Sequence, residues 1–303
     1  MDIDRSMFEK LDNSSKDYEH ISLESKSFLR SSWDRLKKNK MALAGLIVLG
    51  IVILMAIFGP IISPYTYDGQ DAASRNLPPS FEHPFGTDKF GRDIFVRVQY
   101  GARISLLIGF SAAGVCLVIG VIYGGISGFV GGLLDIIMMR IVEILVCIPN
   151  LLIIILVMLK FGSSVFSVLL GICLTSWTNM ARIVRTQVLT LKEQEFALAV
   201  KVMGAGKARI LFKHLIVNCV GPIIVSVMLI VPSAIFSEAF LSFVGIGIAA
   251  PMASWGTLAN EARSLLELYP VQAIWPVAAI CITMLSLNFI GDGLSDALDP
   301  KKK

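Results

Sequence analysis

Charged residues are scarce in this chain of 303 residues: Asp, Glu, Lys and Arg together make up only 17% of it, whereas 55% is hydrophobic. Soluble globular domains carry about 25% charged and about 45–50% apolar residues. A soluble protein as apolar as this one would need a core larger than its polar surface could cover. The scarcity of charge therefore excludes an ordinary soluble domain and predicts a protein whose solvent is the lipid bilayer.

The residues that catalysis and metal binding need are also few. The chain has five cysteines, all within apolar runs and with no CxxC pair, and three histidines, His20, His83 and His214, in three different segments. No HExxH or GxSxG motif is present, and the run from Gly204 to Ala208 lacks the first glycine and the final hydroxyl residue of a phosphate-binding loop. We therefore expect a chain that is not an enzyme, holds no metal or other cofactor, and does not hydrolyse ATP itself.

Long apolar stretches are what the chain has instead. A membrane-spanning helix needs about 20 largely apolar residues. Six stretches meet that requirement: 41–62, 103–127, 134–159, 163–181, 215–244 and 270–291. Pro149 and Pro232 fall inside two of them and are expected to break the helix there. The sequence predicts an all-α membrane protein with about six transmembrane helices, in which residues 103–297 form the core domain.

Basic residues indicate which way the chain crosses the membrane, because cytoplasmic loops are enriched in Lys and Arg. Five of them lie between residues 30 and 40, seven lie between the fourth and fifth spans, and three end the chain. An even number of crossings places all three groups, and both termini, in the cytoplasm. We therefore predict a cytoplasmic N-terminal tail at 1–40, a first span at 41–62, an extracytoplasmic loop at 63–102 and a basic C-terminal tail at 298–303.

The second predicted span carries small residues four positions apart, from Gly101 to Ala113 and again from Gly120 to Gly132. Such spacing lets helix backbones approach closely in lipid. Two kinds of helix could pack against this face. One is another helix of the same subunit, which we favour, and the other is a helix of a second membrane subunit.

The cytoplasmic loop at 186–213 contains an amphipathic helix. Residues 191–203 are predicted to form it, with Glu193 and Glu195 in the first turn, where the helix dipole favours acids, and Gly204 at its end. An apolar stripe follows this helix at positions i, i+3, i+4 and i+7: Phe196, Ala199, Val200 and Met203. The stripe predicts either docking into a groove of another protein or a helix lying on the bilayer surface, and the pattern favours neither.

The segment 195–200, followed by Gly204, resembles the EAA-type coupling loop of ATP-binding-cassette importer permeases. The outer stretch 83–93 resembles a signature of the oligopeptide/dipeptide/nickel branch of that family, C-type subunit, and the Ser-Trp-Gly run at 254–256 matches a further family run. The signature positions are Gly86, Thr87, Asp88, Gly91, Arg92 and Asp93. The resemblance covers the chain from about residue 30 onward and implies the type I importer (MetI-like) permease fold.

Two features depart from the family pattern. The Glu-Ala-Ala triplet is Leu198-Ala199-Val200 here, and the Leu-Pro pair that usually follows the loop is Ile216-Val217. Because the triplet has no glutamate, we assign it no polar role in docking. The glycine at position 204 is kept, and we expect docking itself to be kept with it.

The resemblance implies a set of partners and a mechanism. A second, homologous permease subunit would complete a heterodimer around the pathway, two cytoplasmic ATPase subunits would bind ATP and Mg²⁺, and an extracytoplasmic solute-binding protein would deliver the solute. ATP binding would close the ATPase pair, move helix 191–203 and reorient the permease pair. The resemblance also implies a multi-pass protein of the bacterial cytoplasmic membrane, surrounded by lipid and without nucleic acid as a partner.

The solute that the resemblance favours is an oligopeptide. Nickel or another small solute is the alternative within the same family. A self-sufficient channel or secondary carrier is an alternative from a different class, and it predicts transport by this chain alone.

Polar side chains inside the predicted spans are the candidates for solute contact, because placing a polar group in lipid costs free energy. The candidates for the path are Glu143, Asn150 and Glu238, and Glu238, expected near the outer mouth, is the strongest. An ion pair with Arg140, three residues earlier, is the simpler interpretation of Glu143. Asn179 is expected at the cytoplasmic end of its span, in contact with water.

Overall fold

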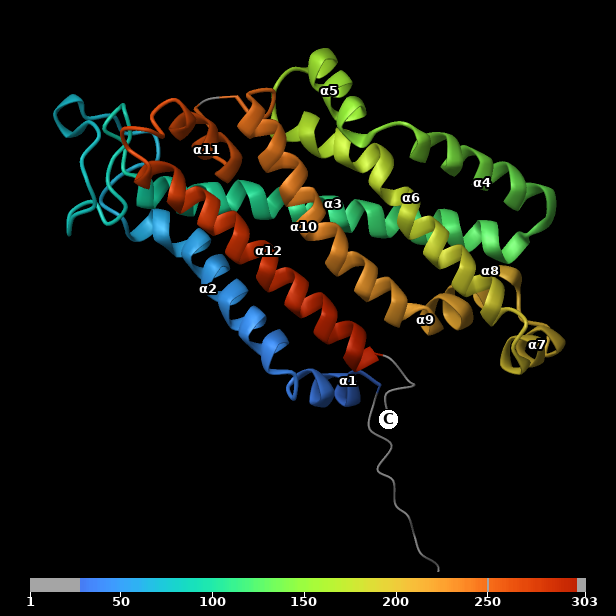
Figure 1. Ribbon diagram of the computed structural model, residues 1–303. Helices are drawn as coiled ribbons and strands as arrows, with labels where there is room; N and C mark the ends of the chain where they lie inside the picture. The colour runs from blue at the N-terminus through green and yellow to red at the C-terminus, as the bar shows by residue number, and fades with distance from the viewer. Residues whose placement is uncertain (1–27, 250, 299–303) are drawn as a thin grey trace, which may run out of the picture.

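The computed structural model describes residues 28–249 and 251–298, in which the long helices form an α-helical bundle (Figure 1). Residues 1–27 and 299–303, and with them most of the two predicted tails, lie outside the described residues. Five helices are long and apolar enough to cross a membrane: α2 (Lys40–Ile62), α3 (Ile94–Val130), α6 (Val165–Leu191), α10 (Val220–Val244) and α12 (Val271–Leu298).

The stretch predicted as one span at 134–159 is two helices. α4 (Gly132–Cys147) and α5 (Asn150–Phe161) are bent by 81° relative to each other. Pro149 lies at this break: it has no backbone N–H to donate, and it holds Ile148 in the extended conformation found there. The prediction of about six spans is confirmed as five to six candidates among the described residues: five continuous helices, and a sixth if the bent pair is counted as one span. The break expected at Pro232 is wrong, since α10 continues through it.

The outer loop is shorter than predicted because α3 starts early. The carboxylate of Asp93 accepts a hydrogen bond of 2.8 Å from the backbone N–H of Val96, which caps the helix and starts it at Ile94. The loop therefore ends at residue 93, and its predicted end at 102 is wrong. Arg97 and Gln99, which we expected in the loop, are buried in the first turns of α3.

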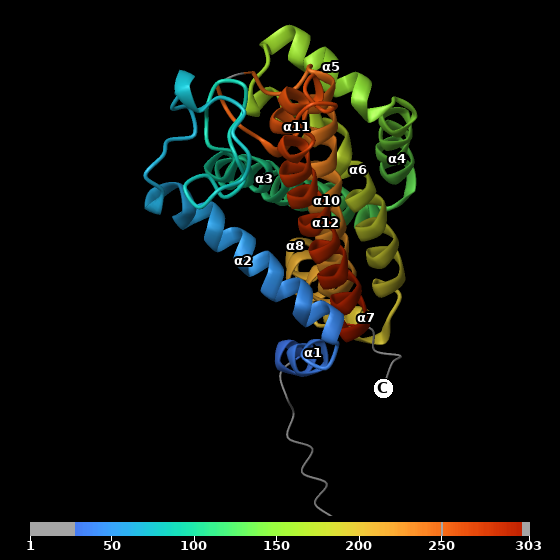
Figure 2. The same cartoon turned by 60° about the vertical axis from the view of Figure 1, so that its left-hand side comes forward.

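Short helices lie at both ends of the bundle. Figure 2 shows α1, α7 and the end of α12 together at one end, and the outer loop with α11 at the opposite end. The first of these ends is the one predicted to be cytoplasmic, and the second is the one predicted to be extracytoplasmic. The short elements are α1 (Phe28–Leu36), η2 (Ala72–Ser74), α7 (Glu195–Val202), α8 (Lys207–Arg209), the π-helix η3 (Ile210–Leu215), α9 (Ile216–Asn218) and α11 (Trp255–Arg263).

α3 lies at the centre of the bundle, packed against α6, α10 and α2 (Figures 1 and 2). Its small residues permit this packing. A Cβ on Gly120, Gly124 or Gly128 would collide with α6, and one on Gly109 would collide with Ile235 of α10. The favoured interpretation of the small-residue face, packing within the subunit, is confirmed.

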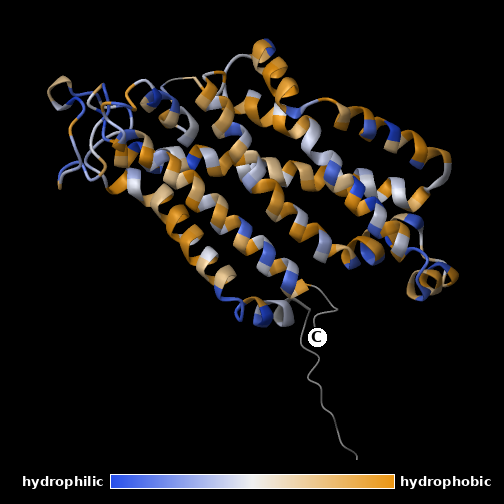
Figure 3. Cartoon of the chain, in the orientation of Figure 1, coloured by the Kyte–Doolittle hydropathy of each residue, from blue (hydrophilic) through white to orange (hydrophobic). Residues whose placement is uncertain are grey.

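Apolar side chains also cover much of the outside of the bundle. Figure 3 shows α2 hydrophobic along nearly its whole length. Its exposed side chains, and those of α4, need lipid or another membrane subunit to cover them. They include Ile47, Ile51, Leu54, Ile57, Ile61, Ile136, Ile141 and Ile144.

Candidate functional sites

The outer signature at 83–93 folds into tight turns held by its own side chains. Gly86 and Gly91 have φ of 77° and 76°, a left-handed conformation that glycine adopts without strain. The hydroxyl of Thr87 accepts a hydrogen bond of 2.8 Å from the backbone N–H of Leu77 and donates one to a loop carbonyl. These signature residues are therefore required by the geometry of the loop itself.

Four charged side chains form a network beneath this loop, which we call the outer charge network: Asp88, Arg92, Arg97 and Glu261. Asp88 Oδ2 lies 2.6 Å from Arg92 Nε and 2.7 Å from Arg97 Nη1. Glu261 Oε2, on α11, lies 2.6 Å from Arg92 Nη2 and 2.6 Å from Arg97 Nη1. The network joins the loop to α3 and α11. Sequence reasoning missed Arg97 and Glu261 because they lie outside the signature.

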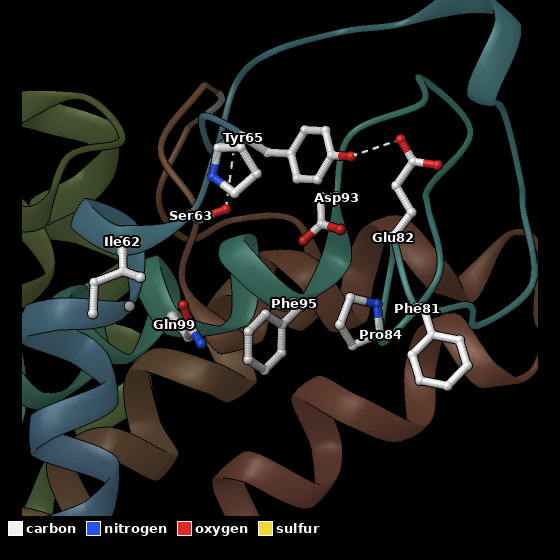
Figure 4. Close-up of a pocket in the computed structure, with 11 residues that line it drawn as sticks. Ile62, Ser63, Tyr65, Phe81, Glu82, Pro84, Asp93, Phe95 and Gln99 are labelled. Carbon is white, nitrogen blue, oxygen red and sulfur yellow. Dashed lines mark hydrogen bonds between the residues drawn. The ribbon is translucent and has the colours of Figure 1, made fainter.

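Asp93 has two structural contacts. Its Oδ2 lies 2.8 Å from His83 Nδ1, and its Oδ1 caps α3. Beside this pair, an open pocket of about 540 Å³ lies between the end of α2 and the loop (Figure 4). Tyr65 donates a hydrogen bond of 3.1 Å to Glu82 in the wall of this pocket, and Phe81 is fully exposed. The signature thus shapes a surface at the outer-loop end of the bundle.

The segment predicted to couple to an ATPase is broken where one helix was predicted. α6 continues to Leu191 and α7 begins only at Glu195, so a single helix over 191–203 is wrong. Glu193 lies in the break, and Glu195 is in the first turn of α7. Gly204 has φ of 81° and follows the last turn of α7, which confirms it as the end of the helix.

The two sides of α7 differ. Ala197 and Val200 pack against the end of the bundle, whereas Phe196, Ala199 and Met203 are exposed. Met203 is 84% exposed. Val200 therefore belongs to the core, and the other three form an apolar surface, the α7 stripe, that no other part of the described chain covers. Docking of a partner on the α7 stripe stays a prediction.

Two of the three candidate path residues have partners within the subunit. Arg140 Nη1 donates a hydrogen bond of 2.6 Å to Glu143 Oε2 on the exposed side of α4, which confirms the expected ion pair. The side-chain oxygen of Asn150 accepts a hydrogen bond from the hydroxyl of Thr175 on α6. A role for either residue in solute transport stays a prediction.

Glu238, the third candidate path residue, is buried. Its exposure is 0%, and its carboxylate accepts hydrogen bonds of 2.9 Å from Ser105 on α3 and of 2.9 Å from Ser242 on α10. Ser105 also accepts a hydrogen bond of 3.4 Å from the backbone N–H of Trp255, the first residue of α11. Glu238 therefore joins α3, α10 and α11 inside the subunit. A role for it in solute transport stays a prediction.

Substitution of Glu238 should affect stability. Glu238→Ala leaves two buried serine hydroxyls without an acceptor, and we expect it to destabilise the chain by about 3 kcal/mol. Glu238→Gln keeps an acceptor and should cost about 1 kcal/mol. Thermal unfolding of the full chain in detergent measures both. A Glu238→Gln variant that folds normally but loses solute uptake would contradict this structural role.

A cavity that sequence reasoning missed lies between α6 and α10, with a volume of about 230 Å³ and both apolar and polar side chains in its lining. Its polar lining consists of one amide and four hydroxyls, and among the described residues no charged side chain lines it: Ser176, Asn179, Ser226, Ser233 and Ser237. Asn179 and Ser233 are exposed, and Ser176 and Ser237 are half-buried. Asn179 therefore belongs to this cavity, which we call the hydroxyl cavity.

Residue spacing is the signal that could have found the hydroxyl cavity. Ser226, Ser233 and Ser237 are seven and four residues apart, which places them on one face of α10. Ser176 and Asn179 are three apart on α6. The sequence search considered only charged and amide side chains and so passed over the hydroxyls. The cavity suits contact with uncharged polar groups of a solute.

Comparison with known proteins identifies most of the chain as part of a transport family. Residues 117–303 match the family described as the inner membrane component of binding-protein-dependent transport systems. Residues 27–79 match the N-terminal transmembrane domain of oligopeptide transport permease C. The family match makes this chain a membrane permease component and not a catalytic ATPase.

Individual relatives cover nearly the full length. The chain is 50% identical to the oligopeptide transport system permease protein OppC of Bacillus subtilis, over 99% of this chain and 98% of that protein. It is 49% identical to the dipeptide transport system permease protein DppC of the same species, over 91% and 86%, and 40% identical to OppC of Escherichia coli K12, over 94% and 95%. The chain therefore belongs to the family of inner membrane permease components of binding-protein-dependent transport systems, in the branch of the oligopeptide and dipeptide C-type permeases.

Proposed function

We propose that this chain is a permease subunit of an ATP-driven importer for oligopeptides and that it forms half of the translocation pathway. The observation that carries the proposal is the hydroxyl cavity between α6 and α10. The relatives support the choice of solute, since the Bacillus subtilis protein aligned with 99% of this chain is named an oligopeptide permease.

The hydroxyl cavity suits the main chain of a peptide. Each peptide unit has one N–H donor and, with its C=O, one acceptor. Asn179, Ser176 and Ser233 can both donate and accept hydrogen bonds. Ser226 and Ser237 already donate to carbonyls of their own helix and are left as acceptors. No charged side chain of the described residues lines the cavity, so it has no ionic preference for acidic or basic peptides. We therefore infer contact through the peptide backbone and acceptance of peptides of diverse sequence.

The cavity is open on one side, which calls for a second subunit. Asn179 and Ser233 are exposed on helices long enough to cross the membrane. Polar groups at that depth are costly when they face lipid. A second, homologous permease subunit would cover this side and supply the other half of the pathway.

The energy for transport would come from two cytoplasmic ATPase subunits that bind ATP and Mg²⁺ and dock on the α7 stripe. Closure of the ATPase pair would move α7 and reorient the two permease subunits. A solute-binding protein would deliver peptides at the opposite end, where the outer charge network holds the loop in place.

Uptake by the complete importer tests this proposal. The chain is purified with the second permease and both ATPases and reconstituted in proteoliposomes with the binding protein, ATP and Mg²⁺. We expect accumulation of labelled acidic, basic and neutral di- to pentapeptides, and no transport by the chain alone under an ion gradient. Uptake of nickel without peptide, or transport driven by the ion gradient alone, would contradict the proposal.

A double variant tests the hydroxyl cavity itself. We expect Asn179→Leu with Ser233→Ala to reduce uptake about tenfold for every peptide class, because about two hydrogen bonds to the peptide are lost. Ser286→Ala is the control: this α12 hydroxyl donates to a carbonyl of its own helix at 2.7 Å, outside the cavity. An equal loss in the control, or a loss confined to one class of peptide charge, would contradict backbone contact.

A further inference from the structure

A cavity of about 740 Å³ lies behind α7 at the cytoplasmic end of the bundle. Its lining includes Val130 at the end of α3, Lys192 after α6, Ala197 and Lys201 of α7, and Lys207 of α8. Ala197 and Lys201 are four residues apart and share one side of α7. The α7 stripe lies on the opposite side of the helix, so the cavity and the stripe are separate surfaces. We call this space the lysine cavity.

The lysine cavity is basic. Lys192 Nζ donates a hydrogen bond of 3.0 Å to the carbonyl of Gly128 at the end of α3. Among the described residues, neither Lys201 nor Lys207 has an ion-pair or hydrogen-bond partner. Glu193 is the one acid of the described chain in the lining, and it is exposed.

The nearest buried acid is already paired. Asp135, on α4, lies 2.5 Å from Arg185 Nε and 2.6 Å from Arg185 Nη2, and it accepts a hydrogen bond of 2.5 Å from Ser127. It also interacts electrostatically with Lys192. Asp135 is therefore unavailable to neutralise Lys201 and Lys207, whose ammonium groups are left for an external anion.

The lysine cavity opens beside an apolar surface. Val130, the last residue of the membrane-length helix α3, is 58% exposed, and Leu133, at the start of α4, is 73% exposed. Phe129 and Leu198 add apolar lining next to the lysines. Ammonium groups beside an exposed apolar surface at the cytoplasmic end of a span match the two parts of a phospholipid, a phosphate and its acyl chains.

We propose that the lysine cavity binds a phosphate-ester anion, supplied by the headgroup of an anionic phospholipid of the inner leaflet. Lys201 and Lys207 contact the phosphate oxygens, and the acyl chains lie along Val130 and Leu133. The bound headgroup supports α7 from behind while the α7 stripe faces the other way. Lipid composition then sets the affinity of α7 for its partner, a consequence that rests on the proposed docking of an ATPase, whereas lipid binding itself does not.

Native mass spectrometry of the full chain, titrated with phosphatidylglycerol, tests the site. We expect Lys201→Gln with Lys207→Gln to weaken binding of the tightest lipid about 30-fold, which corresponds to about 2 kcal/mol. The matched control is Arg209→Gln with Lys213→Gln, which removes the same charge from exposed residues outside the cavity lining. It should change the affinity by less than about twofold.

Two further titrations identify the source of the phosphate. Phosphatidylcholine, with the same acyl chains and no net charge, should bind much more weakly than phosphatidylglycerol. Millimolar inorganic phosphate should not displace the lipid; displacement that depends on Lys201 and Lys207 would support the phosphate site and overturn its lipid source. Equal losses in the two double variants, or no loss in either, would overturn the proposal. None of these readouts involves transport, so they stand apart from the test of peptide import.

Discussion

Phe196→Asp is expected to abolish association with the ATPase subunits and all ATP-driven uptake. Phe196 is an exposed aromatic residue on the α7 stripe, and aromatic side chains that fill a partner's groove carry much of the binding energy of an interface. A carboxylate in that groove would also lose its hydration. We expect a loss of at least about 100-fold in affinity, or about 3 kcal/mol. Co-purification of the ATPases with the tagged chain measures it.

Variants near Phe196 separate docking from folding. Ala208→Asp places the same charge on an exposed residue of α8, off the α7 stripe, and should leave both ATPases bound. Gly204→Glu should fail like Phe196→Asp, because φ is 81° at this position and a charge would stand at the helix end. Gly204→Asn tolerates that φ and should retain binding. Normal co-purification of both ATPases with Phe196→Asp would favour the alternative, a helix on the bilayer surface.

Arg97→Ala is expected to destabilise the chain by about 3–5 kcal/mol. Arg97 is 1% exposed, and its guanidinium contacts both Asp88 and Glu261, so its removal leaves two carboxylates close together with Arg92 as their remaining cation. Folded proteins are stable by only about 5–15 kcal/mol, so we expect little folded protein in the membrane. Thermal unfolding and the yield after size-exclusion chromatography measure the loss.

Arg75→Ala is the control for Arg97→Ala. Arg75 is an exposed residue of the same outer loop, and its loss should change the stability by less than about 0.5 kcal/mol. Equal yields and melting temperatures for the two variants would show that the outer charge network does not stabilise the outer face.

The sequence predicted the features that depend on local pattern. The predicted span at 41–62 differs from α2 by one residue at its start, because an apolar stretch of that length crosses a bilayer as a helix. The end of α7 at Gly204 was predicted correctly, because glycine readily adopts the left-handed backbone conformation that commonly ends a helix. The glycines of α3 predicted close packing, since a missing side chain limits how near a neighbour can come.

Features that depend on distant residues could not be predicted in this way. The sequence shows only that Glu238 is a carboxylate inside a span. Its hydrogen-bond donor Ser105 lies more than a hundred positions away, so the sequence does not reveal that the carboxylate has a partner. Arg97 looked like a loop residue because its partner Glu261 lies on α11. The spacing of the serines places them on one face of α10, but only the pairing of α6 with α10 shows that this face lines the hydroxyl cavity together with Asn179.

α3 has a mechanical consequence for the whole molecule. Its 37 residues span about 55 Å at about 1.5 Å per residue, well beyond the roughly 30 Å hydrocarbon core of a bilayer. One end carries Arg97 of the outer charge network, and at the other the carbonyl of Gly128 holds Lys192, just before α7. α3 is thus one continuous helix between the outer charge network and the residues just before α7. A rigid tilt of α3 by about 5° would displace one end relative to the other by about 5 Å.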